Sequence, residues 1–375
     1  MLSLLKKNFS YSSIEDDEYG SELKLDVTSP SRSSKFIIIK TGTLSLLLVA
    51  FLFLSSILST WIVFFNSKAF SARQDIVSSP VPAASSLSCQ QAPLRREWRT
   101  LTVVEQHDYV RAVRCLTTKP SRIGHNGTLY DDFPWVHKHT STNTHKAAPF
   151  LPWHRYYLNL YETALKQECS FHGNLPYWDW SLDSSNFRAS PVWDPSSGLG
   201  GDGTGPQSVG DGQCVTAGPF SDLEMSFYDG EYQPHCLSRG FPPSNELKAL
   251  GELICPEAIK NLMKESTYED FAPELERRAH TFLSRSVRGD LSRFTGPNDP
   301  IFFLHHVNID RLWTQWQQIQ PAERLSAYGG KANKDSDAVA RMTDALDMGG
   351  LAPQSEKIQV IDVMDVKGGR FCYGY

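Results

Sequence analysis

The 375-residue sequence has no excess of basic residues, and its first 88 positions contain no cysteine. Lys and Arg together number 37 against 42 Asp and Glu, which gives a formal net charge of -5. Proteins that bind nucleic acid neutralise its phosphates with clustered Lys and Arg. Because the basic residues here are spread among acidic ones, the sequence indicates no nucleic-acid partner.

Charge is also absent from residues 41–65, an apolar run of 25 residues. About 20 apolar residues in a helix cross a bilayer core, whereas a signal peptide has a shorter apolar region of about 7–15 residues. We therefore expect a disordered cytoplasmic tail at 1–40, a transmembrane anchor at 41–65 and a Ser/Pro/Ala-rich stalk at 66–88. The weak bias of basic residues toward the N-terminal side of the run favours this orientation. A single domain at 89–375 then lies in the secretory lumen or outside the cell.

The cysteines fit that location, because all seven follow the apolar run and disulfides form in such compartments. The pairing cannot be read from the sequence, and an odd number leaves at least one thiol free or intermolecular. Asn126-Gly127-Thr128 is an acceptor site for N-glycosylation in the same compartment.

The pattern of residues 89–375 predicts a mainly α fold, a central antiparallel helical bundle with long irregular loops and a few short strands. Helices are expected from Thr102, where Glu105 completes a capping box, and from about Leu151. Two more are expected at 269–286 and 300–318. The Gly-rich stretch 198–212 is expected to be irregular, and 357–364 is a strand candidate.

Histidines form two groups along the chain. His137, His139, His145 and His154 fall within eighteen residues, and a second group, His280, His305 and His306, follows over a hundred residues later. A single histidine is more often a core or surface residue than a ligand, but this grouping favours a metal site. Imidazole suits copper, zinc, iron and nickel, and the scarcity of Cys and carboxylates nearby disfavours structural zinc. An all-histidine site in a helical bundle suits a redox metal that binds O2.

Two stretches resemble the copper-binding signatures of tyrosinases. The first is His145 followed by FLPWHRYYLNLYE at 150–162, and the second is DPIFFLHHVNIDRLW at 299–313. The stretches YDDFPWVHKHTSTNTH, LPYWDWSLD and RREWRTL further resemble the fungal, secretory-pathway branch of this family. The resemblance covers about residues 89–320.

The resemblance implies a pair of copper ions, and its motifs assign residues to them. The expected ligands of the first copper are His137, His145 and His154, and those of the second are His280 and His306. His139 is a weaker alternative to His137, and His305 is expected beside the second copper without binding it. Arg155 and Asp310 are expected to form a buried ion pair between the two signature helices.

Three positions depart from the family's pattern. Ser284 stands four residues after His280, where a third imidazole of the second copper is expected. Water or His305 completes that site, the site stays mostly empty, or another histidine such as His235 is brought in. Asn143 replaces a cysteine that forms a thioether in many fungal members, so no such cross-link is expected. Thr281 replaces an Asn typical of members that hydroxylate monophenols, which puts that activity in doubt.

The resemblance implies a copper-dependent oxidase or monooxygenase that uses O2 on phenolic or tyrosyl substrates. A short, membrane-anchored chain is similar to the tyrosinases of ustiloxin- and phomopsin-like mycotoxin clusters, which implies a small molecule or a processed peptide as substrate and other oxidases of the pathway as partners. The final CYGY resembles the Tyr-x-Tyr that closes fungal catalytic domains, so no shielding C-terminal domain is expected. The alternative function is a degenerate copper- or O2-binding protein, or a scaffold, with an impaired second copper site.

Overall fold

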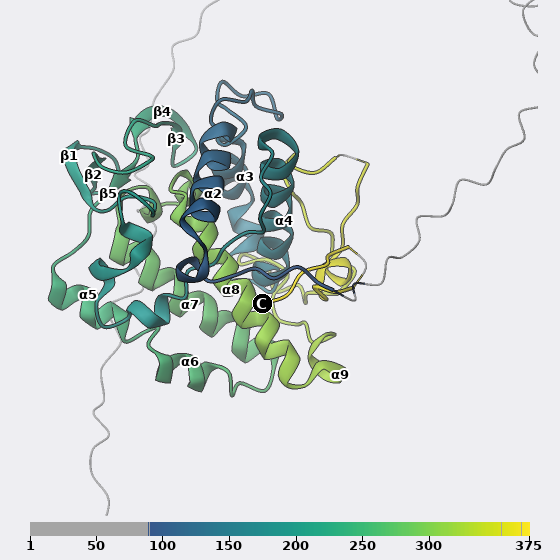
Figure 1. The fold of residues 1–375 in the computed structure, drawn as a ribbon. Coiled ribbons are helices and arrows are strands. Elements are labelled where there is room, and N and C mark those ends of the chain that lie inside the picture. Colours follow the sequence, from purple (N-terminus) through teal and green to yellow (C-terminus); the bar gives the residue numbers. More distant parts are fainter. Residues whose placement is uncertain (1–88, 90, 354, 369) are drawn as a thin grey trace, which may run out of the picture. The chain divides into compact units, whose positions relative to one another are not determined.

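Five helices make up the centre of the fold in the computed structural model (Figure 1). They are α2 (Val103–Leu116), α3 (Asp132–Thr144), α4 (Phe150–Cys169), α7 (Tyr268–Val287) and α8 (Ile301–Ile319). Helix α4 packs against α2, α3, α7 and α8, so it is the element around which the others are arranged.

The structure describes residues 89, 91–353, 355–368 and 370–375, and these belong to one compact unit. Within these ranges no helix has the length and apolar character needed to cross a membrane. The predicted tail, anchor and stalk (1–40, 41–65 and 66–88) lie outside the described residues.

Four of the central helices lie where the sequence pattern predicts them. Helix α2 begins after the expected capping box, in which the Glu105 N–H donates to Thr102 Oγ1 and the Thr102 N–H donates to Glu105 Oε2. The ends of α7 and α8 differ from the predicted ranges by one residue, and α4 begins one residue before Leu151. Residues that recur at helical spacing along α4 are all buried, namely His154, Leu158, Tyr161 and Leu165.

Helix α3 and the short helices are not predicted by the sequence pattern. The second half of α3 is rich in Ser and Thr, which are neutral to unfavourable inside helices. Its hydroxyls are accommodated by the helix itself, since Thr140 Oγ1 donates to the Val136 carbonyl at 2.9 Å and Thr144 Oγ1 to the Thr140 carbonyl at 3.2 Å. The short helices are α5 (Ser244–Gly251), α6 (Pro256–Leu262) and α9 (Pro321–Arg324).

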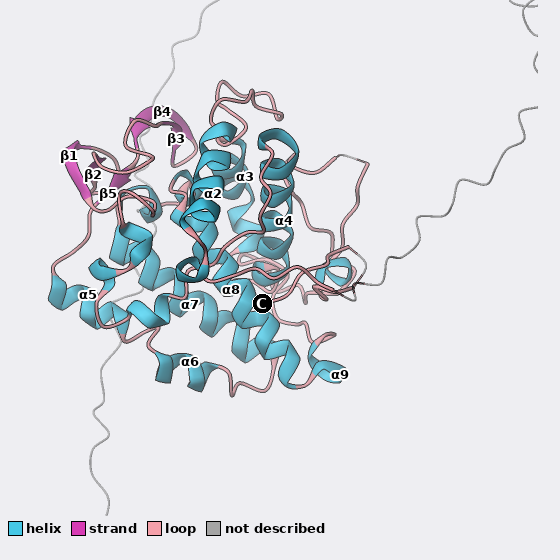
Figure 2. Ribbon diagram, viewed as in Figure 1, coloured by secondary structure: helices cyan, strands magenta, loops and turns pink. Residues whose placement is uncertain are grey.

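The described strands lie to one side of the helices, in two small antiparallel sheets (Figure 2). The first has the order β1-β2-β5, with β1 (Gly203–Gln207), β2 (Gln213–Val215) and β5 (Ser238–Arg239). The second is the pair β3 (Glu224–Tyr228) and β4 (Glu231–Cys236). Strand β1 lies inside the Gly-rich stretch that the sequence pattern marks as irregular.

The prediction of a strand at 357–364 is wrong. Residues Val360–Val363 form a 3-10 helix, and only an isolated bridge from Gln359 to Ala345 has β character. The Gln359 N–H donates to Asp362 Oδ2 at 2.9 Å, which caps the helix start. Val360 and Val363 are both buried, and their spacing of three is typical of a helical turn and not of a strand.

Three disulfides join different elements of the fold. Cys115–Cys169 ties α2 to the end of α4, Cys214–Cys236 links β2 to β4, and Cys89–Cys372 joins the two ends of the described chain. Cys255 is the remaining thiol and is free, in agreement with the odd number of cysteines.

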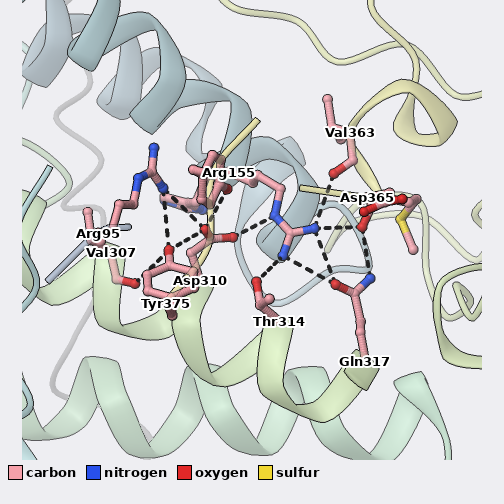
Figure 3. A network of polar contacts seen from close by, with 12 residues as sticks. Arg95, Arg155, Val307, Asp310, Thr314, Gln317, Val363, Asp365 and Tyr375 are labelled. Atoms are coloured by element: carbon pink, nitrogen blue, oxygen red, sulfur yellow. Dashed lines mark hydrogen bonds and ion pairs between the residues drawn. The ribbon is translucent and has the colours of Figure 1, made fainter. Parts of the chain in front are cut away.

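The predicted buried ion pair between α4 and α8 is confirmed. Arg155 Nε lies 2.5 Å from Asp310 Oδ1, and the two side chains are 0% and 3% exposed. The same guanidinium donates to Thr314 Oγ1 at 3.0 Å (Figure 3) and to the Met364 carbonyl at 2.7 Å. Its centre lies 3.6 Å from the Trp313 ring. Arg155 thus holds α4, α8 and the C-terminal segment together.

The other oxygen of Asp310 is also fully used. Oδ2 accepts hydrogen bonds from Tyr373 Oη at 2.7 Å and Tyr375 Oη at 2.5 Å, and Arg95 Nη1 lies at 3.3 Å (Figure 3). Burial alone raises the pKa of Asp310, but the charges of Arg155 and Arg95 and the tyrosine hydrogen bonds outweigh it and hold the pKa below its ordinary value.

We expect Asp310→Asn to cost about 3–5 kcal/mol of unfolding free energy, because it leaves the buried Arg155 guanidinium without its anion and removes one of the two carboxylates beside Arg95. Since the folded pKa of Asp310 is depressed, its contribution is complete above the unfolded pKa of about 4 and is lost as the pH falls through the folded pKa. Urea unfolding at pH 7 and pH 3 should therefore show a difference between wild type and variant that is large at pH 7 and smaller at pH 3.

The matched control is Asp222→Asn, which breaks the exposed ion pair with Arg114 and should cost less than about 1 kcal/mol. Equal losses in the two variants at pH 7 would contradict the role assigned to Asp310.

Candidate metal centre

The structure brings together all five histidines that the sequence proposes as ligands. His137 lies on α3, His145 at its end, His154 on α4, His280 on α7 and His306 on α8. The His145 ring centroid is 4.8 Å from that of His137, 5.0 Å from that of His154 and 5.1 Å from that of His280. The His154 and His306 rings stack at 4.3 Å. Their assignment to particular copper ions stays a prediction.

The first three histidines are held in one orientation by their Nδ1 atoms. His137 Nδ1 donates to the Phe294 carbonyl at 2.6 Å, and His154 Nδ1 to the Phe150 carbonyl at 2.8 Å. His145 Nδ1 lies 3.0 Å from Thr144 Oγ1, whose own hydrogen goes to the Thr140 carbonyl. A carbonyl can only accept, so the proton sits on Nδ1 and the lone pair on Nε2, the arrangement that metal-binding histidines show.

The Nε2 atoms of this group face one another. Those of His137 and His154 are 3.2 Å apart, and Nε2 of His145 is buried without a hydrogen-bond partner among the described residues. The ligand atoms of all three lie within 4.8 Å of one another. Imidazole nitrogens bound at about 2.0–2.1 Å to one tetrahedral metal lie about 3.3 Å apart. Two lone pairs at 3.2 Å repel unless a cation lies between them, so the group fits a metal ion.

Burial keeps these rings neutral. It lowers the pKa of His137 to about 3 and those of His145 and His154 well below the ordinary value, with neighbouring histidines adding to the shift in all three. Only a neutral imidazole binds a metal, so the site is in the binding-competent state at neutral pH.

The second group supplies fewer imidazoles. The rings of His280 and His306 are 5.5 Å apart, and His280 Nε2 is buried with no hydrogen-bond partner in the described part of the chain. Burial, followed by the charge of Lys146, lowers the pKa of His280 to about 4. Ser284 stands one turn further along α7 and brings no ring nitrogen.

The remaining candidate histidines lie outside the cluster or beside it. His139 is exposed and stacks on Trp135 at 3.7 Å, so it lies outside the group of rings that includes His137. His305 is buried beside Trp180, with its ring 6.3 Å from that of His280. The suggestion that His235 enters the second site is wrong, because its ring nitrogens lie 2.7 Å from the Gln233 carbonyl and 2.8 Å from Asp290 Oδ1.

Sequence reasoning missed one residue of the cluster, Glu276 on α7. This carboxylate is buried, and its oxygens accept the Lys146 N–H at 2.9 and 3.1 Å. A carboxylate oxygen of Glu276 and the ligand nitrogens of His145 and His280 lie within 4.8 Å of one another. The available signal was its position four residues before His280, which puts both side chains on one helix face.

Aromatic rings line the cluster. Phe302 lies 4.2 Å from His306, Phe294 lies 4.8 Å from His145, and Phe150 lies 5.2 Å from His280 between ring centroids. Phe150 and Phe302 come from the two signature stretches, whereas Phe294 lies outside both. These rings supply apolar surface around the histidines.

A family model described as the common central domain of tyrosinase matches residues 127–319, the range that carries all five histidines. The chain belongs to the tyrosinase family. It is therefore a copper oxidoreductase of the tyrosinase and catechol-oxidase type, and its mainly helical fold with few strands is the tyrosinase fold.

Several curated tyrosinases are similar to this chain. Tyrosinase-like protein phomQ2 of Diaporthe leptostromiformis is 42% identical over 76% of this chain and 74% of its own length. Tyrosinase-like protein phomQ1 of the same fungus is 36% identical over 96% of both chains. Tyrosinase ustQ of Aspergillus flavus is 42% identical over 76% of this chain and 80% of its own.

Solved tyrosinase-type structures show the same fold. A polyphenol oxidase from Thermothelomyces thermophila superposes with a TM-score of 0.66 at 26% identity, over 76% of this chain and 88% of its own. A functional unit of Octopus hemocyanin, at 18% identity and a TM-score of 0.50, shares the fold over 76% of this chain and 68% of its own.

We expect His137→Ala to lose the first copper, because it removes one of three converging Nε2 atoms. His139→Ala, two residues along the same helix, should keep it, since that ring stacks on Trp135 at the surface. Copper per chain after dialysis, measured by elemental analysis, distinguishes the two variants. Equal copper contents would show that α3 contributes no ligand through His137.

Proposed function

We propose that this tyrosinase is a copper-dependent oxidase or monooxygenase of phenolic or tyrosyl substrates, with O2 as the second substrate. His137, His145 and His154 hold the first copper, and His280 and His306 contribute to the second. When bound, the copper pair supplies the redox chemistry that activates O2. The observation that carries this proposal is the 3.2 Å approach of the His137 and His154 Nε2 atoms beside the unpartnered Nε2 of His145.

The protein's own residues prepare this centre in two ways. The Phe294 and Phe150 carbonyls fix the tautomers and the aim of His137 and His154. The rings of Phe150, Phe294 and Phe302 surround the histidines with apolar surface that limits water and matches an aromatic substrate. The substrate class follows from this apolar, aromatic environment together with family membership.

A role in fungal secondary metabolism is supported by the similarity to phomQ1, phomQ2 and ustQ, and by the resemblance to tyrosinases of mycotoxin clusters. The substrate we propose is a small phenol or a tyrosine residue of a processed peptide, which is hydroxylated, oxidised to a quinone or cross-linked. Other oxidases of such a pathway are the proposed partners.

The proposed location is the secretory pathway, with residues 41–65 as a single membrane anchor and the N-terminus in the cytoplasm. Three disulfides in the described residues support an oxidising compartment for the catalytic domain. Asn126 is exposed in the loop between α2 and α3, where a glycan meets no steric obstacle from the core.

Glycosylation gives a direct test of this location. We expect endoglycosidase treatment to lower the apparent mass of the chain made in a fungal host, and Asn126→Gln to abolish that shift. Asn186→Gln, at an exposed Asn outside any acceptor sequence, should leave it unchanged. A wild-type chain without any endoglycosidase-sensitive mass would contradict the lumenal placement.

Ser284 favours a second candidate function, a degenerate copper- or O2-binding protein or scaffold with an impaired second site. A hydroxyl is a poor copper ligand beside imidazole, and the structure places only His280 and His306 of the second group against the first three histidines.

Copper stoichiometry and catechol turnover separate the two candidates. The leading proposal predicts two metal ions per chain, the near-ultraviolet absorption band that a coupled copper pair develops with O2, and turnover of a catechol. One copper without that band would favour the degenerate candidate. The band without catechol turnover would favour reversible O2 binding.

A further inference from the structure

We propose that the Glu276 carboxylate binds the second metal ion in place of the imidazole that Ser284 does not supply. The second position then has a mixed donor set, Glu276, His280 and His306, while the first position has three imidazoles. This inference rests on the proposed function, because it requires two neighbouring metal positions.

The geometry of α7 supports this role. Glu276, His280 and Ser284 are spaced by four residues, so their side chains leave the same helix face. The Ser284 side chain is short, and its hydroxyl is a weak metal ligand. The longer side chain of Glu276 approaches His280 from the preceding turn of α7. Its carboxylate is already within 4.8 Å of the His280 and His145 ligand nitrogens. Ligands about 2.0–2.2 Å from one metal are about 3.3 Å apart, a distance that torsions of the Glu side chain can close.

The hydrogen bonds from Lys146 leave Glu276 able to bind a metal. The Lys146 N–H donates to both oxygens of Glu276, and a carboxylate can bind a metal ion through one lone pair while it accepts hydrogen bonds through others. The contact also has a function, since Lys146 adopts a left-handed backbone conformation with φ of 52° directly after His145. Such a conformation is unfavourable for a residue with a side chain. Glu276 therefore aims His145 through the backbone as well as facing His280.

His145 cannot serve both metal positions at once. His145 is a member of both groups of side chains whose ligand atoms lie within 4.8 Å of one another, and with its Nδ1 protonated it offers a metal only Nε2. One nitrogen has one lone pair, so an ion bound at the first position removes His145 from the second. His306 is then the third donor, with its ring 5.5 Å from that of His280.

The carboxylate changes which ions the second position accepts. Two imidazoles and a carboxylate are the donor set of many iron(II) sites and also suit zinc, whereas three imidazoles suit copper as well as zinc. The negative charge further favours divalent over monovalent ions. The structure thus assigns different metal preferences to the two positions of one centre.

The test is metal titration of the full chain in detergent after removal of metal with a chelator. Calorimetry with Cu²⁺ and then Zn²⁺ gives the number of ions and the affinity of each. We expect two ions in the wild type, and in Glu276→Gln a second-ion affinity at least about tenfold lower with the first unchanged. Electron paramagnetic resonance of the Cu²⁺-loaded proteins should show the loss as the spectrum of a single, uncoupled ion.

Two further variants make the result specific. Glu276→Gln keeps an oxygen that accepts the Lys146 N–H, so it removes charge and ligand strength while preserving the local fold. Glu274→Gln, which alters only the partially exposed ion pairs with Arg277 and Arg278 on the same helix, should bind both ions like the wild type. Adding Ser284→His to Glu276→Gln should restore the second ion, because it supplies a third imidazole.

The inference is overturned if Glu276→Gln binds the second ion as tightly as the wild type, or if the wild type binds one ion and the variant does the same. The proposed function fails by a different result, namely absence of the first copper. A third outcome separates the two proposals. If the wild type binds two ions and Glu276→Gln loses the second, the ligand role of Glu276 is supported. If that wild type does not turn over a catechol, the proposed activity is contradicted.

Discussion

The buried ion pair between Arg155 and Asp310 is the constraint on which the metal centre depends. Arg155 follows His154 directly on α4, and Asp310 lies four residues after His306 on α8, so the pair acts next to one histidine from each half of the centre. Apolar side chains allow two helices to slide or rotate slightly, whereas a buried ion pair is stable in only a few arrangements. The stacking of His154 on His306 at 4.3 Å and 11° is the geometry that this pair maintains.

The ends of the domain contribute to the same constraint. Tyr373 and Tyr375 donate to Asp310, and Arg95 lies between Asp310 and Glu162 of α4. Burial and the nearby Asp310 charge raise the pKa values of both tyrosines, so their hydroxyls remain donors. Tyr373 and Tyr375 are therefore part of the scaffold that aligns α4 with α8.

The sequence predicted the parts of the site that repeat with helical periodicity or match a known signature. Helices α4, α7 and α8 have strong apolar faces, and the signatures identified Arg155 with Asp310 as well as the histidines. Helix α3 was not predicted, because Ser and Thr have low helix propensity. In the structure the hydroxyls of Thr140 and Thr144 donate to carbonyls of the helix itself, which propensity does not reveal. The Phe294 carbonyl that orients His137 is a backbone group 157 residues away, and no side-chain pattern marks it. In the sequence, nothing distinguishes Glu276 from the neighbouring charged residues Glu274 and Arg277, which lie nearer the surface, so it was not predicted as part of the site.

The account describes one centre with two unlike halves, three preorganised imidazoles on one side and a mixed donor set on the other. Its central claim is tested most directly by anomalous X-ray scattering from crystals soaked with copper, with data collected at the copper absorption edge. The account predicts one peak about 2 Å from the Nε2 atoms of His137, His145 and His154. It predicts a second peak beside His280, His306 and Glu276. A crystal in which copper binds elsewhere, such as at His139, while the three converging Nε2 atoms hold none would contradict it.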